Sequence, residues 1–177
     1  EYGYADIVRF LYETVGNIDV NDEDDFGWTA FRIACEYQHE DIIKYLYQII
    51  GSVDMNARDI YQQTAFMIAC EYGHADSVRY FHETIGNVDM NDRDHKGRTA
   101  FMIACKYDRR NIVKYLYEKI GNVDMNARDH KGRTAFMIAC KNGSIDTVKY
   151  FYATIGDVDM KDKDCYQQAA FMLACEN

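Results

Sequence analysis

A seven-residue motif recurs along this chain at a fixed spacing of 35 residues, and each copy ends in cysteine. Each copy reads Thr or Ala, then Ala-Phe, any residue, Ile or Leu, and Ala-Cys, with the cysteines at Cys35, Cys70, Cys105, Cys140 and Cys175. Glycine keeps the same step from Gly16 onward, and aspartate keeps it from Asp19 onward. Because several features share one period, we interpret the chain as a tandem array of a single supersecondary unit.

Each unit is predicted to contain a short first helix. In one unit Thr99 precedes the run Ala-Phe-Met-Ile-Ala-Cys-Lys-Tyr, which is typical of a helix, and its hydroxyl is suited to cap free backbone amides. A tight turn is expected next, because Gly73 and Gly143 stand just past the corresponding helix ends, where glycine most easily adopts left-handed backbone. Gln38 and Asp108 hold this position in other units.

A second helix is predicted after the turn, since the apolar residues at 112, 113, 115, 116 and 120 fall mainly on one helical face. The stretch 121–132 then places glycine and Asx residues around single apolar residues, which favours an extended loop or hairpin. We therefore expect an all-α chain in which helix, turn, helix and projecting hairpin alternate.

This order of elements, with Asp-x-x-Gly-x-Thr-Ala-Phe-Met-Ile-Ala at the start of the first helix, resembles the ankyrin repeat and its signature Thr-Pro-Leu-His-x-Ala. Gly73-His74 to Val78, and Val88-Asp89-Met90-Asn91, are similar to the family's Gly-His-x-x-x-Val and Ala-Asp-Val-Asn patterns. The resemblance covers the whole chain and implies an ankyrin-type solenoid of paired helices with projecting hairpin loops.

The chain departs from the family pattern in three ways. Its repeats exceed the usual length of about 33 residues by two, alanine fills every proline position, and Phe-Met or Phe-Arg replaces Leu-His. In the family that histidine ties neighbouring turns together, so we do not carry over the family's hydrogen bonding between repeats.

The period divides residues 1–177 into one array: a second half-repeat (1–23), full repeats (24–58, 59–93, 94–128, 129–163) and a first half-repeat (164–177). Solenoids need polar terminal units, yet we expect apolar residues to be partly uncovered at both ends, namely Ile7, Val8, Leu11, Phe171, Met172 and Leu173. This predicts either an excerpt of a longer array or a head-to-tail contact between copies that yields filaments. The start at Glu1 without methionine favours the excerpt.

Composition narrows the class of protein. With 48% hydrophobic residues, 28% charged residues and a net charge of −9, the chain is expected to bury a continuous core. No apolar run approaches the ~20 residues that cross a bilayer, and no signal-peptide pattern is present, so we expect a cytoplasmic, intracellular location without membrane insertion. The acidic balance argues against nonspecific nucleic-acid binding.

Catalytic and metal sites are not expected. Equivalent cysteines one repeat apart would lie roughly 10 Å from each other, beyond the ~7 Å limit for a disulfide, so they are predicted to be reduced and buried. Cys165 falls in a hairpin and is predicted to be exposed. No Cys-x-x-Cys, Cys/His cluster or common catalytic motif occurs, and the histidines are read as turn or surface residues. We predict a non-catalytic protein with no cofactor.

The resemblance implies that hairpin tips and the exposed sides of first helices line a concave groove that binds a partner. At these positions the amino-terminal half is aromatic and acidic, with candidate contact residues Phe26, Trp28, Tyr37, Tyr61 and Tyr72. The following half is basic apart from one tyrosine, with candidates His95, Lys96, Arg98, Lys106, Tyr107, His130, Lys131, Arg133 and Lys141.

This pattern predicts a protein or peptide partner with an apolar or basic segment followed by an acidic one. Charges would mainly orient the partner, and the aromatic side chains would supply affinity. The competing interpretation is a structural subunit that binds copies of itself, head to tail or laterally, while the rings and charges only pack and solubilise neighbouring hairpins.

Overall fold

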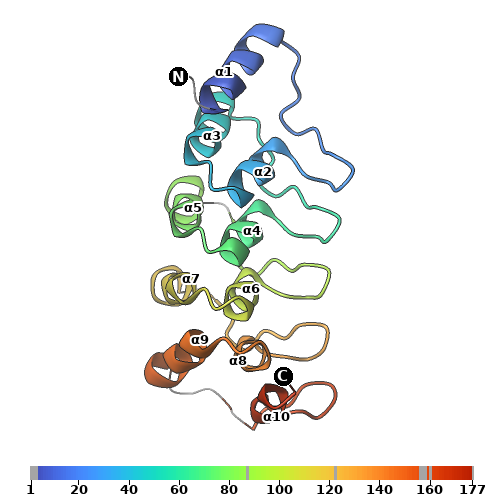
Figure 1. Cartoon of the computed structure of the whole chain (residues 1–177), viewed down its shortest axis with the longest axis vertical. Helices are drawn as coiled ribbons and strands as arrows, with labels where there is room; N and C mark the ends of the chain where they lie inside the picture. The colour runs from blue at the N-terminus through green and yellow to red at the C-terminus, as the bar shows by residue number, and fades with distance from the viewer. Residues whose placement is uncertain (1–3, 87, 122, 156–158, 160, 177) are drawn as a thin grey trace.

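The computed structural model describes residues 4–86, 88–121, 123–155, 159 and 161–176. Helices stand in two columns, and loops project from one side of the stack (Figure 1). One column holds the first helices of the repeats: α2 (Ala30–Glu36), α4 (Ala65–Tyr72), α6 (Ala100–Lys106), α8 (Ala135–Lys141) and α10 (Ala170–Ala174). The other holds the second helices: α1 (Tyr4–Val15), α3 (Glu40–Tyr45), α5 (Ala75–Tyr80), α7 (Arg110–Tyr115) and α9 (Ile145–Tyr150).

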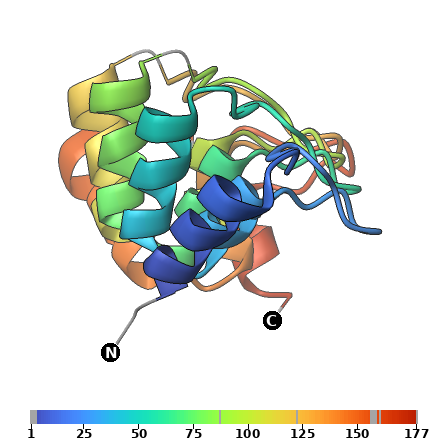
Figure 2. The same cartoon turned by 90° about the horizontal axis from the view of Figure 1, so that it is seen from above.

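Successive hairpin loops project in the same direction, away from the column of second helices (Figure 2). Within the described residues there is no strand, and a single isolated bridge pairs Lys163 with Ala169. The predicted all-α repeat of paired helices is therefore confirmed.

Threonine caps the first helices as the sequence predicts. The hydroxyls of Thr29, Thr64, Thr99 and Thr134 each accept a hydrogen bond from the amide three residues further on, at 3.3–3.4 Å. The predicted turn residues also have left-handed backbone, with φ of 89° at Gly73, 70° at Gly143, 57° at Gln38 and 55° at Asp108. These local signals are sufficient to place each first helix and its turn.

The second helices end in a way that the sequence does not predict. Four of them continue into a π-helical turn: η1 (Leu46–Ile50), η2 (Phe81–Ile85), η3 (Leu116–Ile120) and η4 (Phe151–Ile155). The amide of Gly51 donates to the carbonyl of Leu46 at 3.3 Å, and that of Gly86 to Phe81 at 3.0 Å. Each π-helical hydrogen bond spans five residues instead of four, which widens the last turn of the helix. This wide turn lies next to the two residues by which the repeat exceeds the family length.

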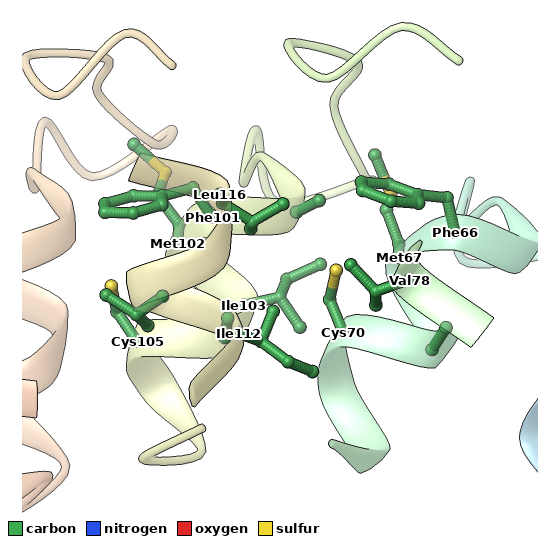
Figure 3. Packing of buried hydrophobic residues seen from close by; sticks show 14 of the residues in the cluster. Phe66, Met67, Cys70, Val78, Phe101, Met102, Ile103, Cys105, Ile112 and Leu116 are labelled. Carbon is green, nitrogen blue, oxygen red and sulfur yellow. The ribbon is translucent and has the colours of Figure 1, made fainter. Parts of the chain in front are cut away.

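The core runs continuously between the two columns (Figure 3). The first helices α2, α4, α6 and α8 each contribute a buried phenylalanine. Their rings meet second-helix rings edge to face: Phe66 lies 5.6 Å from Phe81 in the same repeat, and Phe31 lies 5.8 Å from Phe81 in the next. Such edge-to-face pairs add to the stability that apolar burial provides.

The cysteine prediction is only partly correct. Cys35, Cys70 and Cys105 are buried, whereas Cys140 is half-buried and Cys175 is exposed. Cys140 lies on α8, against which α10 packs, and Cys175 lies just past the end of α10. Cys165 is exposed, as predicted, and all six thiols are free.

Backbone hydrogen bonds join neighbouring hairpins. The amide of Ile60 donates to Phe26, that of His95 to Tyr61, that of His130 to Lys96, and that of Cys165 to Lys131, all at 2.9–3.0 Å. Arginine adds side-chain bonds, because Arg93 Nη1 donates both to the carbonyl of Gly97 at 2.7 Å and to that of Arg128 at 2.6 Å. These contacts connect the repeats without the histidine of the family signature.

A second set of bonds joins the turns to the preceding first helix. His74 Nε2 lies 2.7 Å from the carbonyl oxygen of Glu36, and Arg109 Nε donates to the carbonyl of Glu71 at 2.8 Å. Ser144 Oγ makes the equivalent bond to Lys106 at 3.0 Å. Different residue types therefore satisfy the same helix end in successive repeats, which fixes the first helices relative to one another.

Candidate functional site

An aspartate shapes each hairpin tip. Asp94 Oδ1 accepts hydrogen bonds from the amides of Lys96 at 2.9 Å and Arg98 at 2.8 Å, while its own amide donates to the carbonyl of Arg98 at 3.0 Å. Gly97 has a φ of 75°, and a Cβ there would lie 2.5 Å from the His130 ring. The side chains at positions 95 and 96 are consequently presented at a rigid tip beside the next repeat.

The aromatic candidates of the first half are exposed, with one exception. The exposed fractions are 54% for Phe26, 62% for Tyr37, 48% for Tyr61 and 46% for Tyr72. The Tyr72 hydroxyl donates to Glu36 Oε1 at 3.0 Å, which holds this ring in place. Four rings are thus available on the hairpin tips and first helices, where the sequence places them.

Trp28 is the exception, because it is half-buried and packs over another side chain. The guanidinium carbon of Arg32 lies 4.0 Å from its ring centre, and Arg32 in turn pairs with Glu36 at 2.7 Å and Asp59 at 3.0 Å. The Trp28 ring therefore covers a buried cation and is less accessible than the other four, and its role in binding a partner stays a prediction.

All eight basic candidates line one cleft of about 330 Å³ between two neighbouring repeats. We call this the basic cleft; its lining residues are His95, Lys96, Arg98, Lys106, Asp129, His130, Lys131, Arg133, Ile138, Lys141 and Asn142. Tyr107 is half-buried beside it, and its hydroxyl accepts a hydrogen bond from Lys106 Nζ at 2.8 Å. The hairpin tips and first helices therefore bring together residues that are up to 47 positions apart in the sequence, from His95 to Asn142.

The arginines of the cleft are engaged within the protein. Arg98 is only 6% exposed, and its Nε donates to Asp94 Oδ2 at 2.7 Å. Arg133 makes the same pair with Asp129, at 2.9 Å from Nε and 2.6 Å from Nη2. Arg98 therefore forms part of the cleft wall, with its charge balanced by the buried Asp94 carboxylate, and its role in binding a partner stays a prediction.

Three lysines of the cleft keep an uncompensated charge. Among the ion pairs of the described residues, Lys141 pairs with Glu176, but Lys96, Lys106 and Lys131 belong to none. Burial, followed by the positive charge of Arg98, lowers the pKa of Lys106, and Glu71 offsets part of this effect. The cleft therefore concentrates positive charge in a chain whose net charge is −9.

Sequence reasoning missed Asp129, Asn142 and Ile138 as lining residues. Asn142 stands in register with Tyr37, Tyr72 and Tyr107, so the 35-residue period contained the signal for it. Ile138 carried no such signal, because its equivalent Ile103 is fully buried.

A family model described as "Ankyrin repeats (3 copies)" matches this chain at residues 1–59, 47–129 and 120–177. The chain belongs to the ankyrin repeat family. A search of curated proteins found no match to it. Members of this family are typically non-catalytic modules that bind other proteins.

Two further findings concern this ankyrin repeat array. Across the part of the chain that the structure describes, no three His, Cys, Asp or Glu side chains are grouped so that they could hold a metal ion. None of the helices there has both the length and the apolar character that crossing a membrane requires.

Proposed function

We propose that this array is a non-catalytic scaffold that binds a partner protein or peptide through its groove, the surface formed by the hairpin tips and the exposed sides of the first helices. The observation that carries the proposal is the set of exposed rings at Phe26, Tyr37, Tyr61 and Tyr72, of which Tyr61 lies 5.3 Å from the His95 ring of the basic cleft. Aromatic side chains dominate the energetics of protein interfaces. Six free thiols fit an intracellular, reducing location.

A displayed library of random linear peptides, selected against the full chain, provides the test. We expect peptides that bind at least tenfold more weakly to Tyr37→Ala or Tyr72→Ala than to the unaltered chain. Tyr152→Ala is the matched control, because this tyrosine is 76% exposed but lies on η4, in the column of second helices. Selected peptides whose binding depends on Tyr152 instead would show that the binding surface lies on the column of second helices.

A second candidate function is head-to-tail self-assembly, which exposed apolar side chains at both ends of the stack favour. Phe10 on α1 is 63% exposed, and Phe171 and Met172 on α10 are 80% and 52% exposed. Light scattering over a range of protein concentrations tests this candidate. Masses that rise in multiples of one chain, and fall to the monomer in Phe171→Glu, would support it, whereas a monomer at every concentration would refute it.

A further inference from the structure

We infer that the basic cleft is the subsite for an acidic segment of the partner, a short extended peptide whose carboxylates or phosphates lie against Lys96, Lys106 and Lys131. This inference rests on the proposed function and names the chemistry of the ligand at one part of the groove. The charge balance of the cleft, the alignment of its hairpins and its surroundings support it.

The side chains that line the cleft carry an excess of positive charge, which an anionic ligand would neutralise. Six cationic side chains line it, and Arg98, Arg133 and Lys141 have carboxylate partners in Asp94, Asp129 and Glu176. The remaining three lysines present ammonium groups without an ion pair in the described structure, and each ammonium carries three donors. Hydrogen bonds between ammonium groups and oxyanions are stronger than those between neutral groups.

The alignment of the hairpins suits an extended chain that runs along the array. The amide of His130 donates to the carbonyl of Lys96 at 2.9 Å, which holds two tips side by side. Lys96 and Lys131 occupy equivalent positions on these tips, and both are exposed. Lys106 ends the first helix α6 and lines the same cleft, where the Tyr107 hydroxyl accepts one of its hydrogen bonds. A peptide that crosses both tips would therefore meet three ammonium groups.

The surroundings favour a short acidic peptide over a nucleic acid. A volume of about 330 Å³ is at the small end for ligand pockets, so it accommodates a few side chains. The neighbouring aromatic half carries Asp25 and Glu71, which would repel a long polyanion that continued along the groove. An acidic stretch followed by apolar residues avoids this repulsion and reaches Tyr72.

Three fluorescein-labelled peptides of equal length test the inference by fluorescence anisotropy with the full chain. One contains consecutive glutamates, the second phosphoserines and the third glutamines. We expect at least one of the two anionic peptides to bind tenfold or more tightly than the glutamine peptide, and to weaken as salt rises. The tighter of the two identifies whether carboxylates or phosphates are the preferred oxyanions.

Charge reversal locates the site. Lys96→Glu with Lys131→Glu should weaken anionic-peptide binding at least tenfold. Lys114→Glu with Lys149→Glu, in the same two repeats but on α7 and α9, changes the net charge equally and should leave affinity within about twofold. Equal losses in both double variants, or equal binding of the glutamine peptide, would overturn the inference.

Failure of this inference is distinguishable from failure of the proposed function. If library-selected peptides depend on Tyr37 or Tyr72 while neither anionic peptide binds, the groove binds a partner but the basic cleft is no acidic subsite. If a labelled nucleic-acid oligomer binds with loss in Lys96→Glu and Lys131→Glu while both anionic peptides do not, the peptide assignment is wrong.

Discussion

Arg32 on α2 donates from Nη2 to Oδ2 of Asp59 at 3.0 Å, and this buried ion pair joins one repeat to the hairpin of the next. The two side chains are 6% and 0% exposed. In the next repeat the hairpin aspartate is paired in another way. Met67 stands in the position of Arg32, and Asp94 pairs with Arg98 of its own repeat. Equivalent buried carboxylates are therefore paired with an arginine of the preceding repeat in one case and with an arginine of the same repeat in the other.

Arg32→Met should destabilise the fold by roughly 2–4 kcal/mol, because it leaves the buried Asp59 without its cation. Asp59 would keep the hydrogen bonds that the amides of Tyr61 and Gln63 donate to Oδ1. Urea denaturation followed by circular dichroism measures the change.

Adding Gln63→Arg to Arg32→Met provides the control, since it recreates the pairing of Arg98 with Asp94. We expect the double variant to recover at least half of the lost stability. Additive losses in the double-mutant cycle would mean that Asp59 does not need a cation.

The helix cap at Ala169 offers a stabilising change. Its backbone has φ and ψ of −83° and 163°, close to the −78° and 167° of Thr134, but it lacks a capping side chain. Ala169→Thr should therefore supply the missing bond and stabilise the fold by about 0.5–1 kcal/mol, whereas Thr134→Ala should cost about 1 kcal/mol. Thermal unfolding measures both variants, and a loss in Ala169→Thr would contradict the expectation.

Tyr150 makes stability depend on alkaline pH. Burial, and then the hydrogen bond that its hydroxyl donates to Glu118 Oε1 at 3.1 Å, raise the pKa of Tyr150 to about 12. Because the folded pKa exceeds the ordinary value of about 10, this contribution is complete below pH ~10 and is lost as pH rises toward 12.

Tyr150→Phe should consequently cost roughly 1 kcal/mol at neutral pH and show a smaller decline in unfolding free energy between pH ~10 and ~12. Tyr152→Phe is the matched control, because this ring is exposed. Urea titrations across that pH range provide the measurement. Parallel declines in the unaltered chain and Tyr150→Phe would show that other groups account for the pH dependence.

The cysteines should differ sharply in reactivity. Burial raises the pKa of the Cys35, Cys70 and Cys105 thiols well above its usual range, which suppresses the reactive thiolate, while Cys165 and Cys175 are exposed. We expect a disulfide reagent to label the two exposed thiols first and the three buried ones only on unfolding. Peptide mass spectrometry identifies the sites, and rapid labelling of Cys70 in the native chain would contradict the described core.

Much of the fold was accessible from the sequence because its signals are local. Thr99 caps the helix that begins one residue later, and Gly73 has left-handed backbone at the turn that it was predicted to form. The π turn ending at Ile50 was not accessible, because an amphipathic pattern specifies a buried face without specifying which carbonyl each amide selects.

The sequence likewise predicted only part of the candidate site. Placing Lys96 and Lys131 on neighbouring tips needed only the 35-residue period, whereas the burial of Arg98 and the packing of Trp28 on Arg32 were not predicted.

The sequence by itself determined that the chain is a helical repeat array, which residues cap its first helices, and which residues form the turns after them. Helix caps, turn residues and apolar periodicity act between residues that are close along the chain. Only the tertiary structure decided that Arg32 reaches Asp59, that Cys140 is half-buried, and which cations of the basic cleft keep their charge unpaired. These outcomes depend on distances across stacked repeats and on burial, and neither is fixed until the helices pack.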